Sequence, residues 1–136
     1  MIIRVGDRSS YTRTFSEEDV RLFAQITGDT NSVHLDEEYA ARTVFRGRVA
    51  HGLLTAGLIS TVLGTKLPGL GTIYLSQTLR FLLPVKIGDT VTATVRVVEI
   101  NAEKRKARLE TVCTNQAGKE VLVGEAVVVN SEMSTA

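Results

Sequence analysis

The hydrophobic pattern of the chain changes its period once, and this change constrains the fold more than any other feature. Residues 49–64 are apolar on most sides of a helix, whereas apolar and polar residues alternate from residue 71 onward. A helix that is apolar on most sides is buried, and a period of two is typical of a sheet with one face on the core. The sequence therefore predicts an α+β fold with a long antiparallel sheet wrapped around a buried central helix.

The alternating part of the chain predicts several long strands in a meander. Apolar residues alternate with polar ones over residues 73–83, 91–97, 107–113 and 121–129. Turn-forming residues separate these segments, and strands joined by short turns pair antiparallel. On the helix, Gly52, Ala56 and Ser60 form a narrow stripe of small residues. The stripe indicates a close approach, chiefly by a neighbouring strand.

Capping signals organise the first third of the chain. A serine followed by three acidic residues predicts a helix over residues 16–27, which Gly28 ends. Asp36 predicts the N-cap of a short helical turn through Ala41. Residues 28–36 are rich in turn formers, so we expect a loop that presents polar side chains.

The composition is typical of a globular domain. The chain has 136 residues, of which 43% are hydrophobic and 23% charged, and this length can bury a core. No repeat or linker divides it, so we expect one domain over residues 1–136, with a disordered tail after about residue 130. The formal net charge is +1 without a long run of one sign, which gives no support to nucleic-acid binding.

Cysteine usage and the apolar runs predict where the protein is found. The single cysteine, Cys113, lies in a strand-like segment, and we expect a small buried hydrophobe there. No apolar run reaches the roughly 20 residues of a membrane span, and residues 1–7 lack the pattern of a secretory signal. We therefore expect a cytoplasmic protein that does not enter a membrane.

Two residues of the loop are candidates for acid–base chemistry. Asp29 carries a carboxylate that is an anion near pH 7, and His34 carries an imidazole that is largely neutral. Both groups can accept a hydrogen bond from one water molecule. Spacing alone favours the simpler interpretation that Asp29 caps the turn and His34 is an ordinary loop histidine.

The residues around this pair resemble a known family. The resemblance covers roughly residues 10–130 and is carried by Gly28–His34 with Ala40, Ala50–Leu53, Ile73–Gln77, Phe81–Asp89 and Gly124–Ala126. These segments resemble the MaoC-like, R-specific enoyl-CoA hydratases, which have the hot-dog fold. The chain is most similar to the short, single-domain hydratases that supply (R)-3-hydroxyacyl-CoA to polyhydroxyalkanoate synthesis, a branch of fatty acid metabolism.

The resemblance implies a hydro-lyase that adds water to trans-2-enoyl-CoA and gives (R)-3-hydroxyacyl-CoA, reversibly. It implies that Asp29 and His34 are catalytic and hold the water. The N–H of Gly52 would donate to the thioester carbonyl oxygen, which gathers negative charge as water adds. Asn31, Ser60 and Leu63 would support the loop or line the acyl pocket.

One position departs from the family, and one histidine stays outside the proposed catalytic set. Ser32 stands where the family usually has proline, which frees the backbone angle φ and puts loop rigidity in doubt. For His51, we favour local packing or capping at the helix start over direct chemistry. Ser60 lacks the glycine-flanked turn of a serine nucleophile.

The same resemblance predicts the binding partners of the chain, while the small number of histidines argues against a metal site. Two histidines without a ligand cluster predict neither a metal site nor a cofactor, and coenzyme A is part of the substrate. Coenzyme A rather than acyl carrier protein is the expected carrier. Arg42, Arg46 and Arg48 are candidates for its phosphates, although solvated arginines are the commoner case. We also expect a homodimer or larger homo-oligomer.

Two alternative functions stay open at this stage. A hot-dog acyl-thioester hydrolase would bind the same carbonyl group at a helix N-terminus. A non-catalytic acyl-thioester-binding module would keep the fold without the reaction, and the presence of Asp29, Asn31 and His34 argues against it. Only the hydratase adds water to the double bond without releasing a thiol.

Overall fold

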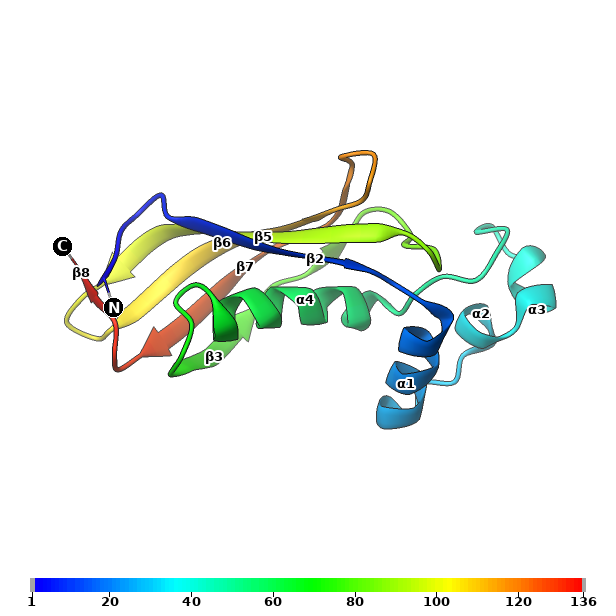
Figure 1. Ribbon diagram of the computed structural model, residues 1–136, viewed down its shortest axis with the longest axis horizontal. Helices are drawn as coiled ribbons and strands as arrows, with labels where there is room; N and C mark the ends of the chain where they lie inside the picture. The colour runs from blue at the N-terminus through cyan, green and yellow to red at the C-terminus, as the bar shows by residue number, and fades with distance from the viewer. Residues whose placement is uncertain (1, 136) are drawn as a thin grey trace.

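The computed structural model describes residues 2–135 as a curved antiparallel sheet with one long helix along one face (Figure 1). The elements in chain order are β1 (Ile2–Ile3), β2 (Arg8–Thr14), α1 (Glu17–Thr27), α2 (Ser32–Leu35), α3 (Glu37–Ala41), α4 (Gly52–Thr65), β3 (Thr72–Gln77), β4 (Arg80–Phe81), β5 (Thr90–Asn101), β6 (Lys106–Thr114), β7 (Glu120–Asn130) and β8 (Ser134–Thr135). The predicted α+β class is confirmed. Within the described residues, no helix has the length and apolar character needed to cross a membrane.

The main sheet has the strand order β2-β5-β6-β7-β3, and β4 also pairs with β7. All of these pairs are antiparallel, and the predicted meander is confirmed as β5, β6 and β7 in succession. Helix α4 separates β2 from β3 in sequence, and these two strands form the two edges of the sheet. The three short helices gather at the end of the molecule opposite the two termini (Figure 1).

The core lies between α4 and the sheet. Leu58, Ile59, Val62 and Leu63 of the helix are buried, and the alternating apolar residues of β5, β6 and β7 face them in one cluster. Burying one such side chain fully contributes roughly 1.5–3 kcal/mol. Cys113 belongs to this cluster, and burial raises the pKa of its thiol to about 12. The expectation of a buried, unreactive cysteine is therefore confirmed.

The expectation that α4 is buried on nearly all sides is wrong for the single chain. Leu53 is 61% exposed, and Gly57 and Ser60 are also exposed. The sheet covers only one side of the helix, so the apolar residues on the other side face outward beside β3. Strand β3 is similar, because Ile73 and Leu75 are exposed on this sheet edge.

The sequence predicted a disordered tail after about residue 130, and residues 131–135 make defined contacts with the rest of the domain. Buried Asn130 donates from Nδ2 to the Leu70 carbonyl, and its Oδ1 accepts from the Glu132 N–H. Met133 is buried, and β8 forms a parallel pair with β1. The tail is held because it closes the open end of the core beside β1, a contact that its polar composition does not reveal.

Helix α1 is fixed by the predicted caps. The Ser16 hydroxyl accepts from the Asp19 N–H, the Asp19 carboxylate accepts from the Ser16 N–H, and Gly28 ends the helix in the left-handed conformation with φ 79°. The Arg13 guanidinium on β2 bonds the Asp19 carboxylate at 2.6 Å and holds its pKa below the ordinary value. These bonds fix α1, and with it the start of the following loop, against the sheet.

The segment 28–36 is more regular than the predicted loop. Asn31 accepts from the Val33 N–H and caps the four-residue helix α2, which carries His34. Asp36 then caps α3 through the Tyr39 N–H, as its position in the sequence predicted. The Asn31 side chain at one end and the Asp36 N–H, which donates to the Ser32 carbonyl, at the other hold α2 in place without a proline at position 32.

Gly124 marks a close approach of two backbones. A Cβ atom at this position of β7 would lie 1.8 Å from the carbonyl oxygen of Thr78. We expect Gly124→Ala to lower the free energy of unfolding by about 1–3 kcal/mol, because one backbone must move away from the other. Urea denaturation measures this change.

Gly64 on α4 provides the matched control. A Cβ there meets nothing within 4 Å. Alanine is favoured over glycine inside a helix, so Gly64→Ala should raise the free energy of unfolding by roughly 0.5–1 kcal/mol. Equal stability of Gly124→Ala and the wild-type protein would contradict the close approach.

Candidate active site

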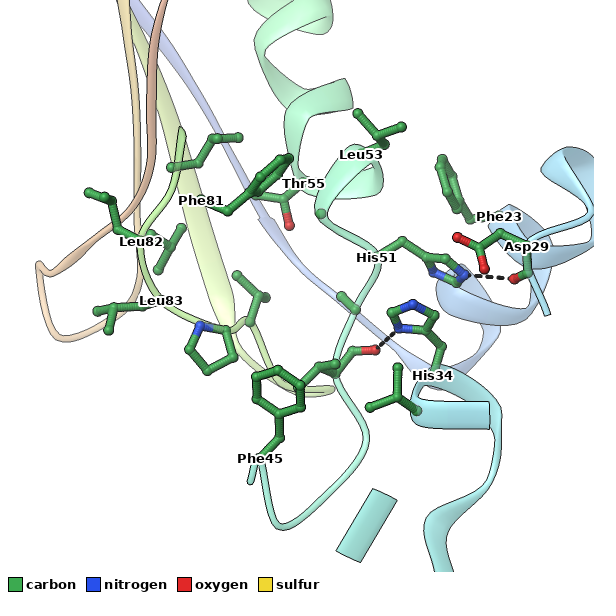
Figure 2. Close-up of a pocket in the computed structure, with 18 residues that line it drawn as sticks. Phe23, Asp29, His34, Phe45, His51, Leu53, Thr55, Phe81, Leu82 and Leu83 are labelled. Carbon is green, nitrogen blue, oxygen red and sulfur yellow. Dashed lines mark hydrogen bonds between the residues drawn. The ribbon is translucent and has the colours of Figure 1, made fainter. Parts of the chain in front are cut away.

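A cavity of about 550 Å³ lies at the N-terminal end of α4. Its walls come from the loop after α1, from α2, from the start of α4 and from the segment around β4. Only four of the lining residues have polar side chains, and these are Asp29, His34, His51 and Thr55. Figure 2 shows Asp29, His34 and His51 grouped together, with Phe81, Leu82 and Leu83 on another part of the wall.

Asp29 follows the end of α1 directly and lines the cavity. Its N–H donates to the Thr27 hydroxyl at 3.2 Å, and its Oδ1 accepts from the Asn31 N–H at 3.3 Å. The capping role that the simpler interpretation assigns to Asp29 is therefore present. It uses Oδ1 alone, and the exposed carboxylate can still bind a second donor.

His34 is oriented by a backbone carbonyl. Its Nδ1 lies 2.7 Å from the oxygen of Val49, and because a carbonyl oxygen only accepts, Nδ1 carries the proton. In the neutral ring, Nε2 is then unprotonated and can accept a hydrogen bond. Half-buried His34 thus presents an acceptor, as a water-activating imidazole must.

The two residues predicted to act together are brought together, and His51 joins them. One ring nitrogen from each histidine and one carboxylate oxygen of Asp29 all lie within 4.8 Å of one another. Two acceptors that share one water molecule lie about 4.5 Å apart, and the 4.8 Å limit on this cluster is compatible with such a water between Asp29 and His34. Such a set can also ligate a divalent cation, and the absence of a metal remains a prediction.

His51 is the residue that sequence reasoning underrated. It is 2% exposed, and although it is the N-cap of α4, its side chain makes no capping bond. Its Nε2 lies 2.9 Å from the Asp29 carbonyl oxygen, and its ring stacks on His34 with 3.8 Å between centroids. One feature of the sequence pointed to His51. The chain has only two histidines, and each lies in a segment that carries the family resemblance.

Gly52 opens the first turn of α4 to the cavity. The first N–H groups of a helix lack intrahelical acceptors and carry partial positive charge. In α4 the Leu54 N–H does bond the His51 carbonyl at 3.1 Å. A Cβ at Gly52 would lie 2.5 Å from Cε1 of Phe81, so glycine is what lets the Phe81 ring pack against the start of α4. The position is compatible with a donor to a substrate oxygen, and this role of Gly52 stays a prediction.

The structure does not place Ser60 or Leu63 in this cavity. Ser60 lines a separate hollow between α4 and β3, and Leu63 is buried in the core. Both lie farther along α4, two or more turns beyond Gly52, and their role toward the acyl chain stays a prediction. Asn31 is not part of the wall either and supports the loop as the cap of α2.

Arg48 is not available for a phosphate group. Its side chain is 9% exposed, its Nε donates to the His34 carbonyl at 2.8 Å, and its Nη1 pairs with Glu17 at 3.0 Å. Arg21 and Arg48 together hold the pKa of Glu17 below its ordinary value. Arg48 thus fastens α2 to α1, while Arg42 and Arg46 are exposed on the segment after α3.

Comparisons of the sequence with known proteins give one family. The family described as MaoC like domain matches residues 5–125. An (R)-specific enoyl-CoA hydratase of Rhodospirillum rubrum is 53% identical over 126 residues, 93% of this chain and 87% of that protein. A 3-hydroxybutyryl-CoA dehydratase of Methylorubrum extorquens is 54% identical over 127 residues, 93% of this chain and 80% of that protein.

Solved structures agree with the sequence comparison. The R-hydratase of Pseudomonas aeruginosa superposes with a TM-score of 0.90 at 48% identity, covering 94% of this chain and 82% of that chain. The (R)-hydratase of A. caviae, involved in PHA biosynthesis, gives 0.92 at 42% identity, covering 94% and 97%. The fold is therefore the hot-dog fold, and the chain belongs to the MaoC-like family.

Proposed function

We propose that the chain is a hydro-lyase that hydrates trans-2-enoyl-CoA to (R)-3-hydroxyacyl-CoA and catalyses the reverse dehydration. The observation that supports this function best is the clustering of Asp29 and His34, whose polar atoms lie within 4.8 Å of each other, beside the first turn of α4. Relatives at 43–54% identity are named as (R)-specific enoyl-CoA hydratases or as a 3-hydroxybutyryl-CoA dehydratase.

The proposed reaction is a one-step addition of water. Asp29 and Nε2 of His34 accept the two hydrogens of one water, whose oxygen attacks Cβ of the enoyl thioester. Asp29 acts as the base, and a proton reaches Cα from the same pair of residues. Negative charge that gathers on the thioester oxygen is stabilised by the Gly52 N–H at the start of α4.

The apolar part of the cavity wall suits a small acyl group. Phe45, Phe81, Leu82 and Leu83 line it and exclude water from the reacting carbons. Coenzyme A is the proposed carrier, with exposed Arg42 and Arg46 as candidates for its phosphates. A cytoplasmic location and a role in polyhydroxyalkanoate synthesis belong to the same proposal.

A homodimer is also part of the proposal. Strand β3 is an edge of the sheet, and Ile73 and Leu75 on it are exposed beside exposed Leu53 of α4. An unpaired apolar edge of this kind is covered by another strand in stable proteins. Pairing with β3 of a second copy would continue the sheet and cover the open side of α4. Sedimentation equilibrium tests this pairing, and a monomer at micromolar concentration would contradict it.

Crotonyl-CoA distinguishes the proposed function from its two alternatives. A hydratase removes the absorbance of the conjugated enoyl thioester without releasing free thiol. A thioesterase releases coenzyme A, which a thiol reagent detects, and a binding module changes neither signal. Release of thiol at the rate of absorbance loss would overturn the proposal in favour of hydrolysis.

A further inference from the structure

We propose that His51 is a positioning residue that fixes Asp29 and His34 relative to each other, an inference that rests on the proposed hydration. Asp29 lies on the loop after α1 and His34 on α2, whereas His51 is the N-cap of the long helix α4. His51 contacts both of them from this third element. Figure 2 shows its ring between the Asp29 loop and the His34 ring.

The contact with Asp29 is a directed hydrogen bond. Nε2 of His51 lies 2.9 Å from the carbonyl oxygen of Asp29, and a carbonyl oxygen only accepts, so Nε2 carries the proton. Asp29 itself is exposed, and the one hydrogen bond that its side chain makes with the residues described, 2–135, comes from the Asn31 N–H at 3.3 Å. The buried imidazole therefore ties the backbone of Asp29 to α4, in addition to the local bond from the Asp29 N–H to the Thr27 hydroxyl.

The contact with His34 is a stack of two rings. The centroids are 3.8 Å apart with 25° between the planes, and Phe23 covers His51 at 4.8 Å. This contact fixes the plane of His34, and the bond from Nδ1 to Val49 fixes its rotation. With both degrees of freedom held, Nε2 of His34 keeps its direction toward the water.

The two histidines must then carry their protons on opposite nitrogens. His34 is protonated on Nδ1 by its bond to Val49, and His51 on Nε2 by its bond to Asp29. Nδ1 of His51 is buried without a hydrogen-bond partner among the described residues, as the neutral Nε2–H form permits. A histidine that only filled space in the core would not need one particular tautomer, so opposite tautomers in the stacked pair are specific to the positioning role.

Nitrogen NMR of the wild-type protein tests this arrangement without using activity. The chain has only two histidines, so a long-range ¹H–¹⁵N spectrum contains only two ring systems. We expect one ring in the Nδ1–H form and one in the Nε2–H form at neutral pH. Two rings of the same tautomer, or a doubly protonated His51, would overturn the proposal even if the protein does not hydrate crotonyl-CoA.

Two substitutions then test the positioning role in the reaction. His51→Gln keeps a terminal N–H that can reach the Asp29 carbonyl, whereas His51→Phe keeps a ring that can stack but has no donor. We expect His51→Phe to lower kcat by about 10–100-fold with KM within about threefold, as for other residues that orient catalytic groups. His51→Gln should retain a kcat within about tenfold of wild type.

The outcomes separate positioning from other roles. An equal loss in His51→Gln and His51→Phe, a rise in KM alone, or wild-type kcat in His51→Phe would each overturn the proposal. If wild-type protein leaves crotonyl-CoA unchanged, hydration itself fails, and the tautomer measurement still decides the geometry. If His51→Phe does not fold, His51→Gln and the wild-type spectrum remain decisive.

Discussion

Asp29→Asn is expected to lower kcat for crotonyl-CoA hydration by about 10²–10⁴-fold, the contribution typical of a general base. The amide keeps an oxygen that can accept from the Asn31 N–H, so the turn after α1 is preserved. What the amide loses is the negative charge that takes a proton from water. Initial rates measured from the loss of enoyl absorbance give the change directly.

Asp7→Asn is the matched control for this substitution. Asp7 accepts from the Arg4 N–H in the turn between β1 and β2, and it is not one of the residues that line the cavity. The same change of charge is made there without touching the cavity, so kcat should stay at the wild-type value. Near-normal turnover in Asp29→Asn, with both proteins folded by circular dichroism, would remove Asp29 from the mechanism.

His34→Asn is expected to cause a loss of similar size, about 10²–10⁴-fold in kcat. The asparagine Nδ2 takes the place of the imidazole Nδ1 and can still donate to the Val49 carbonyl. The acceptor Nε2 has no counterpart in the shorter side chain. The substitution therefore removes one of the two acceptors of the water while it keeps the local hydrogen bond.

The thermal midpoint separates loss of chemistry from loss of fold in this variant. His34 also stacks on His51, so a modest decrease in the midpoint is expected. A protein that unfolds cooperatively and has lost hydration supports the assignment. A folded His34→Asn variant with more than about a tenth of wild-type kcat would contradict it.

Local patterns predicted most of the elements because each depends on neighbours in sequence. The capping residues Ser16 and Asp36 and the helix-ending Gly28 act through their own backbone, and the structure has them where the sequence placed them. The strands β5, β6 and β7 follow the alternation of buried and exposed residues. The exposed side of α4 could not be predicted, because apolar periodicity does not tell which partner covers a face.

The sequence predicted the site residues of the loop, Asp29 and His34, better than the buried residue behind them, His51. Asp29 and His34 lie on one short segment, so a local sequence motif is enough to predict that they lie close together. His51 lies 22 residues along the chain from Asp29, which it contacts through a carbonyl bond, and it contacts His34 through a ring stack. Spacing in the sequence encodes neither contact. Arg48 was misjudged for the same reason, since its partners Glu17 and His34 lie on other elements.

The chirality of the product tests the central claim most directly. Asp29 and His34 lie on one side of the substrate cavity, so the water they hold can reach only one face of the double bond. Purified wild-type protein should convert crotonyl-CoA to (R)-3-hydroxybutyryl-CoA alone, resolved by chiral chromatography of the released acid. Formation of the S product or of a racemate, or no hydration at all, would contradict the account.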